Sequence, residues 1–194
     1  MTKPPQRRRA VKEALEAYRA RASELYVWSD ADSPNEKKEL LKALVAAKRS
    51  LLIDPKNYKT YVLIANICAS LDSRETVHDA LDFYNRAIAV NPDLPDAYAG
   101  KADLLMYHLR RPAQAEELSR RALKSSLRAK EPTELLELRF IGLSGILESR
   151  EKFADARSVI RQALRHSKSE FIKEFAATAL KRIAQLQEPS PLSH

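Results

Sequence analysis

The chain has 194 residues, of which 31% are charged and 44% are hydrophobic, and it carries a formal net charge of +8. This is the composition of a folded protein rather than of a disordered one. Its only glycines, Gly100, Gly142 and Gly145, are too few for a dinucleotide-binding turn, a phosphate-binding loop or the many tight turns of a β-sandwich. The composition therefore predicts an all-α protein.

The positive charge is unevenly distributed. The first ten residues contain no acidic residue and four basic ones, Lys3, Arg7, Arg8 and Arg9. We interpret residues 1–10 as a basic flexible tail, whose attraction to nucleic acid or anionic lipid would be weak and salt-sensitive. Residues 188–194 are predicted to form a second flexible tail. Because the N-terminus lacks the apolar core of a secretory signal, and no apolar stretch is long enough to span a membrane, we predict a cytoplasmic protein.

Prolines divide the chain, and apolar residues recur at helical spacing between them. The pattern predicts nine helices, over residues 7–28, 35–53, 57–71, 75–90, 94–109, 113–128, 133–150, 153–167 and 169–187. Ser33 before Pro34 is typical of a helix start, and Ser167 with Glu170 is a capping signature before the last helix. Trp28 is expected to anchor the loop that follows the first helix. Since all connections are short, successive helices should pack antiparallel.

Small and bulky residues repeat along these helices. Every second helix carries an alanine at an equivalent place, Ala43, Ala80, Ala115 and Ala156, so the steps are 37, 35 and 41 residues. The preceding helices carry a bulky, a small and a bulky residue, four and then three positions apart: Tyr61, Ala65 and Cys68; Tyr98, Ala102 and Leu105; Phe140, Ser144 and Leu147. The small residues are expected where two helices approach closely, because a larger side chain would separate them.

This pattern resembles that of the tetratricopeptide-repeat family, most clearly from Tyr58 to Pro92. The resemblance implies an all-α right-handed superhelical array in one domain over 11–187. Its repeats would cover about residues 11–56, 57–93, 94–131 and 132–168, closed by a capping helix over 169–187. The expected covering stripe of that helix is Phe171, Phe175, Ile183 and Leu186.

The resemblance also implies a concave groove that holds a peptide or helix of a partner protein. The residues that map to the groove are Lys59, Val62, Asn66, Asp96, Ala99, Asp103, Met106, Leu138, Ile141 and Gly145. Asn66 has both a donor and an acceptor for a peptide backbone. For each single position the alternative is a plain solvent-facing helix residue. The positions at which heat-shock co-chaperones of the family bind a terminal carboxylate lack the required cations here, which excludes that ligand.

A second candidate surface is basic. Two rows of cations at a spacing of four are predicted on the outer face: Arg120, Lys124 and Arg128, and Arg157, Arg161 and Arg165. Such rows could contact phosphates. However, Glu116, Glu117 and Asp155 interrupt them, and no aromatic residue is interleaved for base stacking. Binding of nucleic acid or an anionic surface through this face and the basic tail is therefore the alternative function.

Patterns of catalytic residues are missing from the sequence. The four histidines are scattered without metal-ligand spacing, and no serine stands in a nucleophile context. The lone Cys68 lies between apolar neighbours and is expected to be a buried, unreactive thiol. We therefore predict a non-catalytic adaptor or scaffold, without cofactor or metal, that binds another protein or associates with itself.

Overall fold

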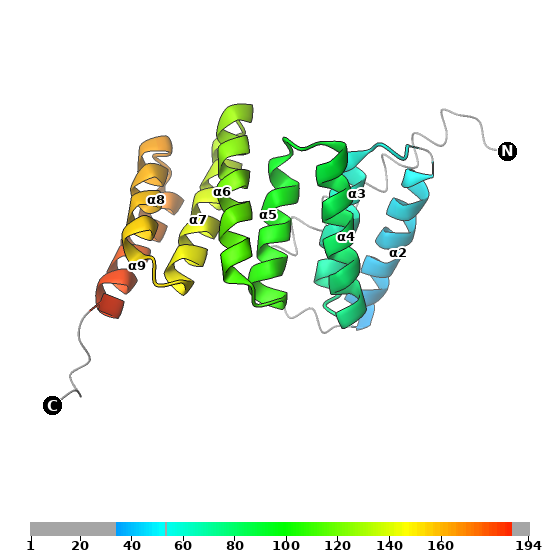
Figure 1. Cartoon of the computed structure of the whole chain (residues 1–194), viewed down its shortest axis with the longest axis horizontal. Coiled ribbons are helices and arrows are strands. Elements are labelled where there is room, and N and C mark those ends of the chain that lie inside the picture. The colour runs from blue at the N-terminus through cyan, green and yellow to red at the C-terminus, as the bar shows by residue number, and fades with distance from the viewer. Residues whose placement is uncertain (1–33, 53, 188–194) are drawn as a thin grey trace. The chain divides into compact units, whose positions relative to one another are not determined.

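The computed structural model describes residues 34–52 and 54–187. In this part of the chain it shows only helices and their connections (Figure 1). The α-helices are α2 Pro34–Leu51, α3 Tyr58–Ser70, α4 Arg74–Val90, α5 Pro95–Asp103, α6 Pro112–Ala129, α7 Thr133–Ser149, α8 Phe153–His166 and α9 Glu170–Gln187. The predicted all-α class is confirmed, and the predicted bounds of these helices agree within two residues, apart from the end of α5. The helix predicted over 7–28, with Trp28, and the Ser33 cap lie outside the described residues.

The predicted helix over 94–109 changes geometry in its last part. After Asp103, the last residue of α5, the chain continues as a π-helix, η1, over Leu104–His108. Its Leu109 N–H donates to the Leu104 carbonyl oxygen at 3.1 Å, a bond between residues five apart. The helical spacing of the sequence did not predict this wider turn.

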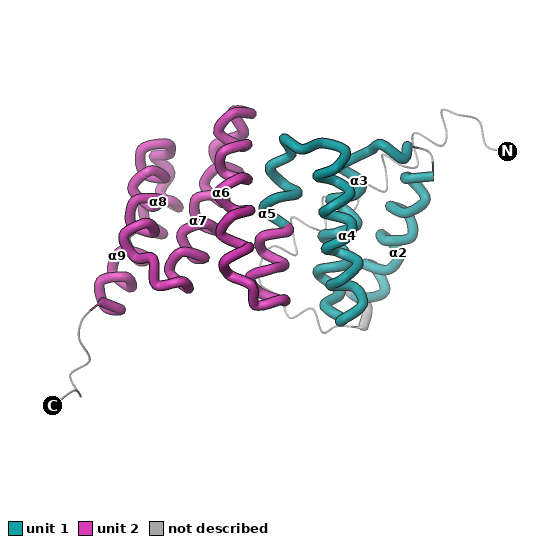
Figure 2. The backbone as a smooth tube through the Cα atoms, in the orientation of Figure 1, with its two compact units in different colours: residues 1–100 teal, residues 101–194 magenta. Residues whose placement is uncertain are grey.

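The chain divides into two compact units, residues 1–100 (unit 1) and residues 101–194 (unit 2), shown in separate colours in Figure 2. Among the described helices, α2, α3, α4 and the first part of α5 belong to unit 1. The end of α5, with η1 and α6 to α9, belongs to unit 2. The single domain over 11–187 and its four repeat bounds remain a prediction.

Small residues lie at the helix contacts of both units. Six of the seven small residues singled out in the repeat have 0% of their surface exposed: Ala65, Ala80, Ala102, Ala115, Ser144 and Ala156. The seventh, Ala43 of α2, is partly buried. Within unit 1, α3 packs against both α2 and α4, and within unit 2, α7 packs against both α6 and α8. Since a larger side chain at these positions would separate the helices, the expectation drawn from the sequence is confirmed.

Helices α3 and α5 are each fixed at their start by a hydrogen bond of the same kind. The Tyr61 hydroxyl of α3 donates to the Pro55 carbonyl oxygen at 2.9 Å, and the Tyr98 hydroxyl of α5 donates to the Pro92 carbonyl oxygen at 2.8 Å. Each bond joins a helix to the turn before it, so it fixes the angle at which the helix leaves the turn. The corresponding Phe140 in unit 2 has no hydroxyl group.

The last helix covers the core of unit 2 with a face that matches the predicted one in part. The residues of α9 that are buried are Ile172, Ala176, Ala179 and Ile183. Of the predicted stripe, Ile183 is buried and Phe175 packs against this core, whereas Phe171 and Leu186 are 55% and 58% exposed. Two alanines stand on the buried face because α9 lies close to its neighbour, which a count of large apolar residues does not detect.

The cap of α9 also differs from the prediction. The Ser169 side chain, and not that of Ser167, accepts the helical N–H of Ile172, at 3.1 Å. Ser167 is buried and donates its hydroxyl proton to Glu137 of α7, and Ser169 donates to the same carboxylate at 2.6 Å. The Ser167–Glu170 signature was therefore wrong in its residues, because Ser167 is used to join two helices. In the described part of the chain, no helix is both long and apolar enough to cross a membrane.

Replacement of Ala102 by Leu tests the close helix contact. Ala102 is fully buried beside Leu105, Ala115 and Ile146, so the larger side chain should lower the free energy of unfolding by about 1–3 kcal/mol through overpacking. Urea unfolding followed by circular dichroism measures the change. Ala184→Leu, at an exposed position of α9, is the control and should change stability by less than about 0.5 kcal/mol. Equal stability of the two variants would contradict the assigned contact.

Candidate partner-binding surface

In unit 1, the residues mapped to the groove come from α3 and from the first part of α5. Lys59, Asn66 and Asp96 are exposed, and Ala99 is partly buried. Val62 is only 9% exposed and belongs to the core of the unit, so it is left out of the surface proposed below.

Asn66 is held in place by a side chain of another helix. The Tyr84 hydroxyl of α4 donates to Asn66 Oδ1 at 2.6 Å, although the two residues are 18 positions apart in the sequence. Tyr84 itself is only 2% exposed, so its ring is fixed by the core. This bond engages one of the two lone pairs of Oδ1 and orients the amide, so that Nδ2 remains as a donor for a ligand.

Gly100 makes room for this bond. A Cβ atom built at Gly100 of α5 would lie 2.4 Å from Tyr84 Oη and 2.6 Å from Tyr84 Cζ, which is closer than Cβ atoms approach other atoms. The tyrosine can therefore reach Asn66 only because residue 100 has no side chain. A glycine inside a helix costs roughly 1 kcal/mol relative to alanine, and here it permits a close approach.

In unit 2, the residues mapped to the groove are more apolar. Met106, Ile141 and Gly145 are partly buried, and Leu138 of α7 is exposed. Ile141 packs against the core formed by α7, α8 and α9, and Met106 packs against the smaller cluster around Ala102. These side chains present part of their apolar surface to solvent while their remainder is fixed by the core.

Asp103, the last residue of α5, is the acidic residue of unit 2 that maps to the groove. Burial raises its pKa from 3.8 to about 6, and the Arg139 guanidinium of α7 opposes that rise. Arg139 Nε also lies 3.7 Å from Glu131 Oε2. Tyr107 is 59% exposed. Burial of the remainder and the Asp103 charge raise the pKa of its hydroxyl group. Sequence reasoning missed Arg139 and Tyr107, because neither occupies a position that the repeat pattern marks.

The basic rows lie on α6 and α8 of unit 2. All of their members are exposed except Arg157, which is partly buried. Arg120 Nε donates to Glu116 Oε1 at 3.0 Å, and Arg120 Nη2 donates to Asp155 Oδ2 at 2.9 Å. Glu116 and Asp155, which interrupt the basic rows in the sequence, thus neutralise Arg120.

Glu116 itself is a buried junction of unit 2. Besides Arg120, it accepts hydrogen bonds from Arg150 and from Lys152, the latter at 3.0 Å, and so joins α6 to the turn between α7 and α8. Burial alone would raise the pKa of Glu116, but the hydrogen bonds from Lys152 and Arg120 outweigh it and hold the pKa below its ordinary value. This cluster holds the helices together and is not open to a ligand.

Cys68 is fully buried, as expected. Burial, aided by the Asp79 charge, raises the pKa of its thiol, so the reactive thiolate is disfavoured. The described residues contain no group of three or more His, Cys, Asp or Glu side chains that could hold a metal ion.

Solved structures with the same arrangement of paired helices are tetratricopeptide-repeat (TPR) proteins. TTC0263, a thermophilic TPR protein of Thermus thermophilus, has a TM-score of 0.62 at 16% identity, over 90% of this chain and 99% of that one. PilW, a type IV pilus biogenesis factor, has a TM-score of 0.63 at 15% identity, over 94% of this chain and 79% of PilW. This chain has the TPR fold.

A third TPR structure, YrrB, is described as having an unusual peptide-binding site. Its TM-score is 0.58 at 17% identity, over 73% of this chain, and the matched part spans 66% of YrrB. No protein-family model matches the sequence, and no curated protein is significantly similar to it. At these identities the similarity shows the TPR fold alone, so the surface residues of this chain have to be judged from their own geometry.

The close approach at Gly100 can be tested with a matched pair of glycine variants. Gly100→Ala should lower the free energy of unfolding by about 1–3 kcal/mol, because the new methyl group displaces Tyr84. Gly142 of α7 has nothing within 4 Å of its built Cβ atom, so Gly142→Ala should raise stability by up to about 1 kcal/mol. Chemical unfolding of both variants measures the effect. Stabilisation by both substitutions would show that Tyr84 does not occupy this position.

The raised pKa of Asp103 predicts a pH dependence of stability. The folded chain binds this proton more tightly than the unfolded chain does, so the stability of the wild type should fall as pH rises from about 4 to about 6. Asp103→Asn removes the titration and should be more stable than the wild type at pH 7, by at most about 3 kcal/mol, and nearly equal to it at pH 4.

Urea unfolding at the two pH values measures this difference. Asp93→Asn, at an exposed position, is the control for the loss of one negative charge. A destabilised Asp103→Asn variant at pH 7 would instead show that the ionised carboxylate stabilises the fold through Arg139.

Proposed function

We propose that this protein is a non-catalytic adaptor that binds a segment of another protein at α3 and the start of α5 in unit 1, with α7 as a second contact surface in unit 2. The TPR fold supports this proposal, because it typically serves as a scaffold for protein interactions. The peptide-binding site reported for YrrB agrees with it. On its own, however, a fold does not define a function, and the proposal depends on the side chains of these surfaces.

The oriented amide of Asn66 is the observation that carries the proposal. Its Oδ1 accepts from Tyr84 at 2.6 Å, and Tyr84 is fixed by the core beside Gly100. The Nδ2 group has no hydrogen-bond partner among the described residues, and the Asn66 side chain is exposed. A donor that is fixed before binding loses little conformational entropy when a carbonyl oxygen arrives.

The free donor favours an extended partner segment over a helical one. In a helix most carbonyl oxygens are already bonded within the helix, whereas those of an extended chain are free to accept. In unit 1, Lys59 and Asp96 add polar contacts. In unit 2, Leu138 and Ile141 offer apolar surface to bulky side chains of a ligand. We therefore propose a partner with an accessible backbone for the surface of unit 1, and with large apolar side chains for the surface of unit 2.

Affinity purification from a lysate of the native host, with nuclease added and with mass spectrometry as the readout, tests the proposal. The Asn66→Ala variant removes the donor. Gln185→Ala, which removes an exposed amide of α9, is the matched control. We expect a discrete partner with the wild type and with Gln185→Ala. A peptide from that partner should bind Asn66→Ala about two- to tenfold more weakly in calorimetry, the usual effect of one hydrogen bond.

Tyr84→Phe separates orientation from contact. This variant keeps the buried ring and the Asn66 amide but loses the bond that orients the amide, so the affinity should fall by a smaller factor than in Asn66→Ala. Identical affinity of wild type and Asn66→Ala for the peptide would refute the proposal. So would partners that are recovered only when the nuclease is omitted, a result that would favour the alternative of nucleic-acid binding.

A further inference from the structure

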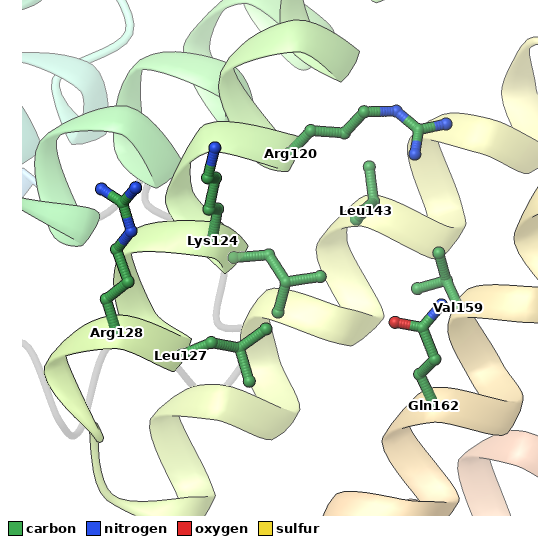
Figure 3. Close-up of a pocket in the computed structure, with 8 residues that line it drawn as sticks. Arg120, Lys124, Leu127, Arg128, Leu143, Val159 and Gln162 are labelled. Carbon is green, nitrogen blue, oxygen red and sulfur yellow. The ribbon is translucent and has the colours of Figure 1, made fainter.

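A pocket in unit 2 lies outside the surfaces proposed above. It has a volume of about 510 Å³ and opens between α6 and α8, with α7 contributing to its lining (Figure 3). The residues that line it are Arg120, Leu123, Lys124, Leu127, Arg128, Leu143, Val159 and Gln162. The repeat pattern placed basic rows on these two helices, but it did not indicate that aliphatic side chains lie between them.

The floor of the pocket is aliphatic. Leu123, Leu143 and Val159 are buried members of the unit 2 core, so they form a fixed surface. Leu127 stands beside them and is 39% exposed. An aliphatic side chain of a ligand placed here would cover Leu127 and be excluded from water, which is a favourable exchange.

The rim of the pocket is cationic, and only one of its three cations forms ion pairs with acidic residues of the described chain. Arg120 is bonded to Glu116 and Asp155. Lys124 and Arg128, which follow on the same row of α6 (Figure 3), have no ion pair with any described residue. Two cations beside the apolar floor are therefore available to an anionic ligand.

The surrounding charge is mainly positive, although Glu116, Glu117 and Asp155 lie just before the two basic stretches. Residues 118–130 contain five basic and no acidic residues, and residues 156–168 contain four basic and no acidic residues. Together these two stretches carry nine positive charges, more than the net charge of +8 of the whole chain. A concentrated positive field of this kind attracts acidic ligands and accelerates their association.

The mixed lining favours an acidic peptide over a nucleic acid. Nucleic acid binds through phosphates and, when single-stranded, through stacking of bases on aromatic rings. No aromatic side chain lines this pocket, and Leu127 offers nothing to a phosphate. A peptide with carboxylates and a large aliphatic side chain matches both the cationic rim and the aliphatic floor.

We propose that this pocket binds an acidic amphipathic segment of a partner protein. An aliphatic side chain of the segment covers Leu127, and carboxylates of the segment pair with Lys124 and Arg128. The surface does not include Asn66, so the inference does not rest on the function proposed above.

Fluorescence anisotropy with the full chain tests the proposal. The probe is a labelled helical peptide of Leu and Glu with leucines along one face. The comparison ligands are polyglutamate and oligouridylate. At about 0.15 M salt, where exposed charges are screened beyond roughly 8 Å, we expect the Leu–Glu peptide to bind more tightly than either comparison ligand.

Two variants alter the pocket, and two serve as controls. The double variant Lys124→Glu/Arg128→Glu should weaken binding of the Leu–Glu peptide by about tenfold or more, and Leu127→Ser should weaken it several-fold. Lys37→Glu/Lys38→Glu makes the same change of charge at exposed positions of α2 and should retain binding. Asn66→Ala should retain it as well, which separates this proposal from the first. Circular dichroism confirms that each variant is folded.

Several results would overturn the proposal. Polyglutamate or oligouridylate that binds as tightly as the Leu–Glu peptide, with no effect of Leu127→Ser, would show a general polyanion surface. An equal loss of binding in the Lys37→Glu/Lys38→Glu control, or a loss in Asn66→Ala, would place the peptide elsewhere. Absence of peptide binding by the folded wild type would refute the site.

Discussion

Close approach of helices is the constraint on which the structure depends. Two helices can pack at short range only where neither carries a large side chain at the contact. In both units the chain meets this requirement with alanine or serine, and six of these seven residues are excluded from solvent. The same constraint reaches the surface at Gly100, where even a methyl group would displace Tyr84. The packing that stabilises unit 1 thus also determines which group Asn66 presents.

The helices could be predicted from the sequence because their signals are local. Prolines and the period of apolar residues give the bounds, and the recurring small residues give the helix contacts. Prediction failed where a residue serves a distant partner. Ser167 has the features of a cap, but it binds Glu137, which lies 30 positions earlier in the chain. The buried face of α9 was misjudged in part for a related reason, since Ala176 and Ala179 pack closely although they are small.

The candidate surface was predictable only as a set of positions. Repeat spacing assigned Asn66 and Asp103 to the groove-lining helix of their repeats. It could not show that Tyr84 binds Asn66, or that Arg139 lowers the pKa of Asp103. These partners lie on other helices, and the repeat spacing does not show which side chains of neighbouring helices meet. One signal was present: Gly100 is a glycine in the middle of a helix, in a chain with three glycines. Such a residue indicates that another group approaches the backbone.

The π-helix η1 has a consequence for aligning this chain with other TPR sequences. A π turn spans five residues between bonded groups where an α turn spans four, so it accommodates one inserted residue without ending the helix. Each residue advances an α-helix by about 100°. Counting in threes and fours therefore loses its register within Leu104–His108, the last five residues of the helix. In an alignment with a relative that lacks the π turn and one residue, the gap belongs at the end of this helix rather than in the connection that follows.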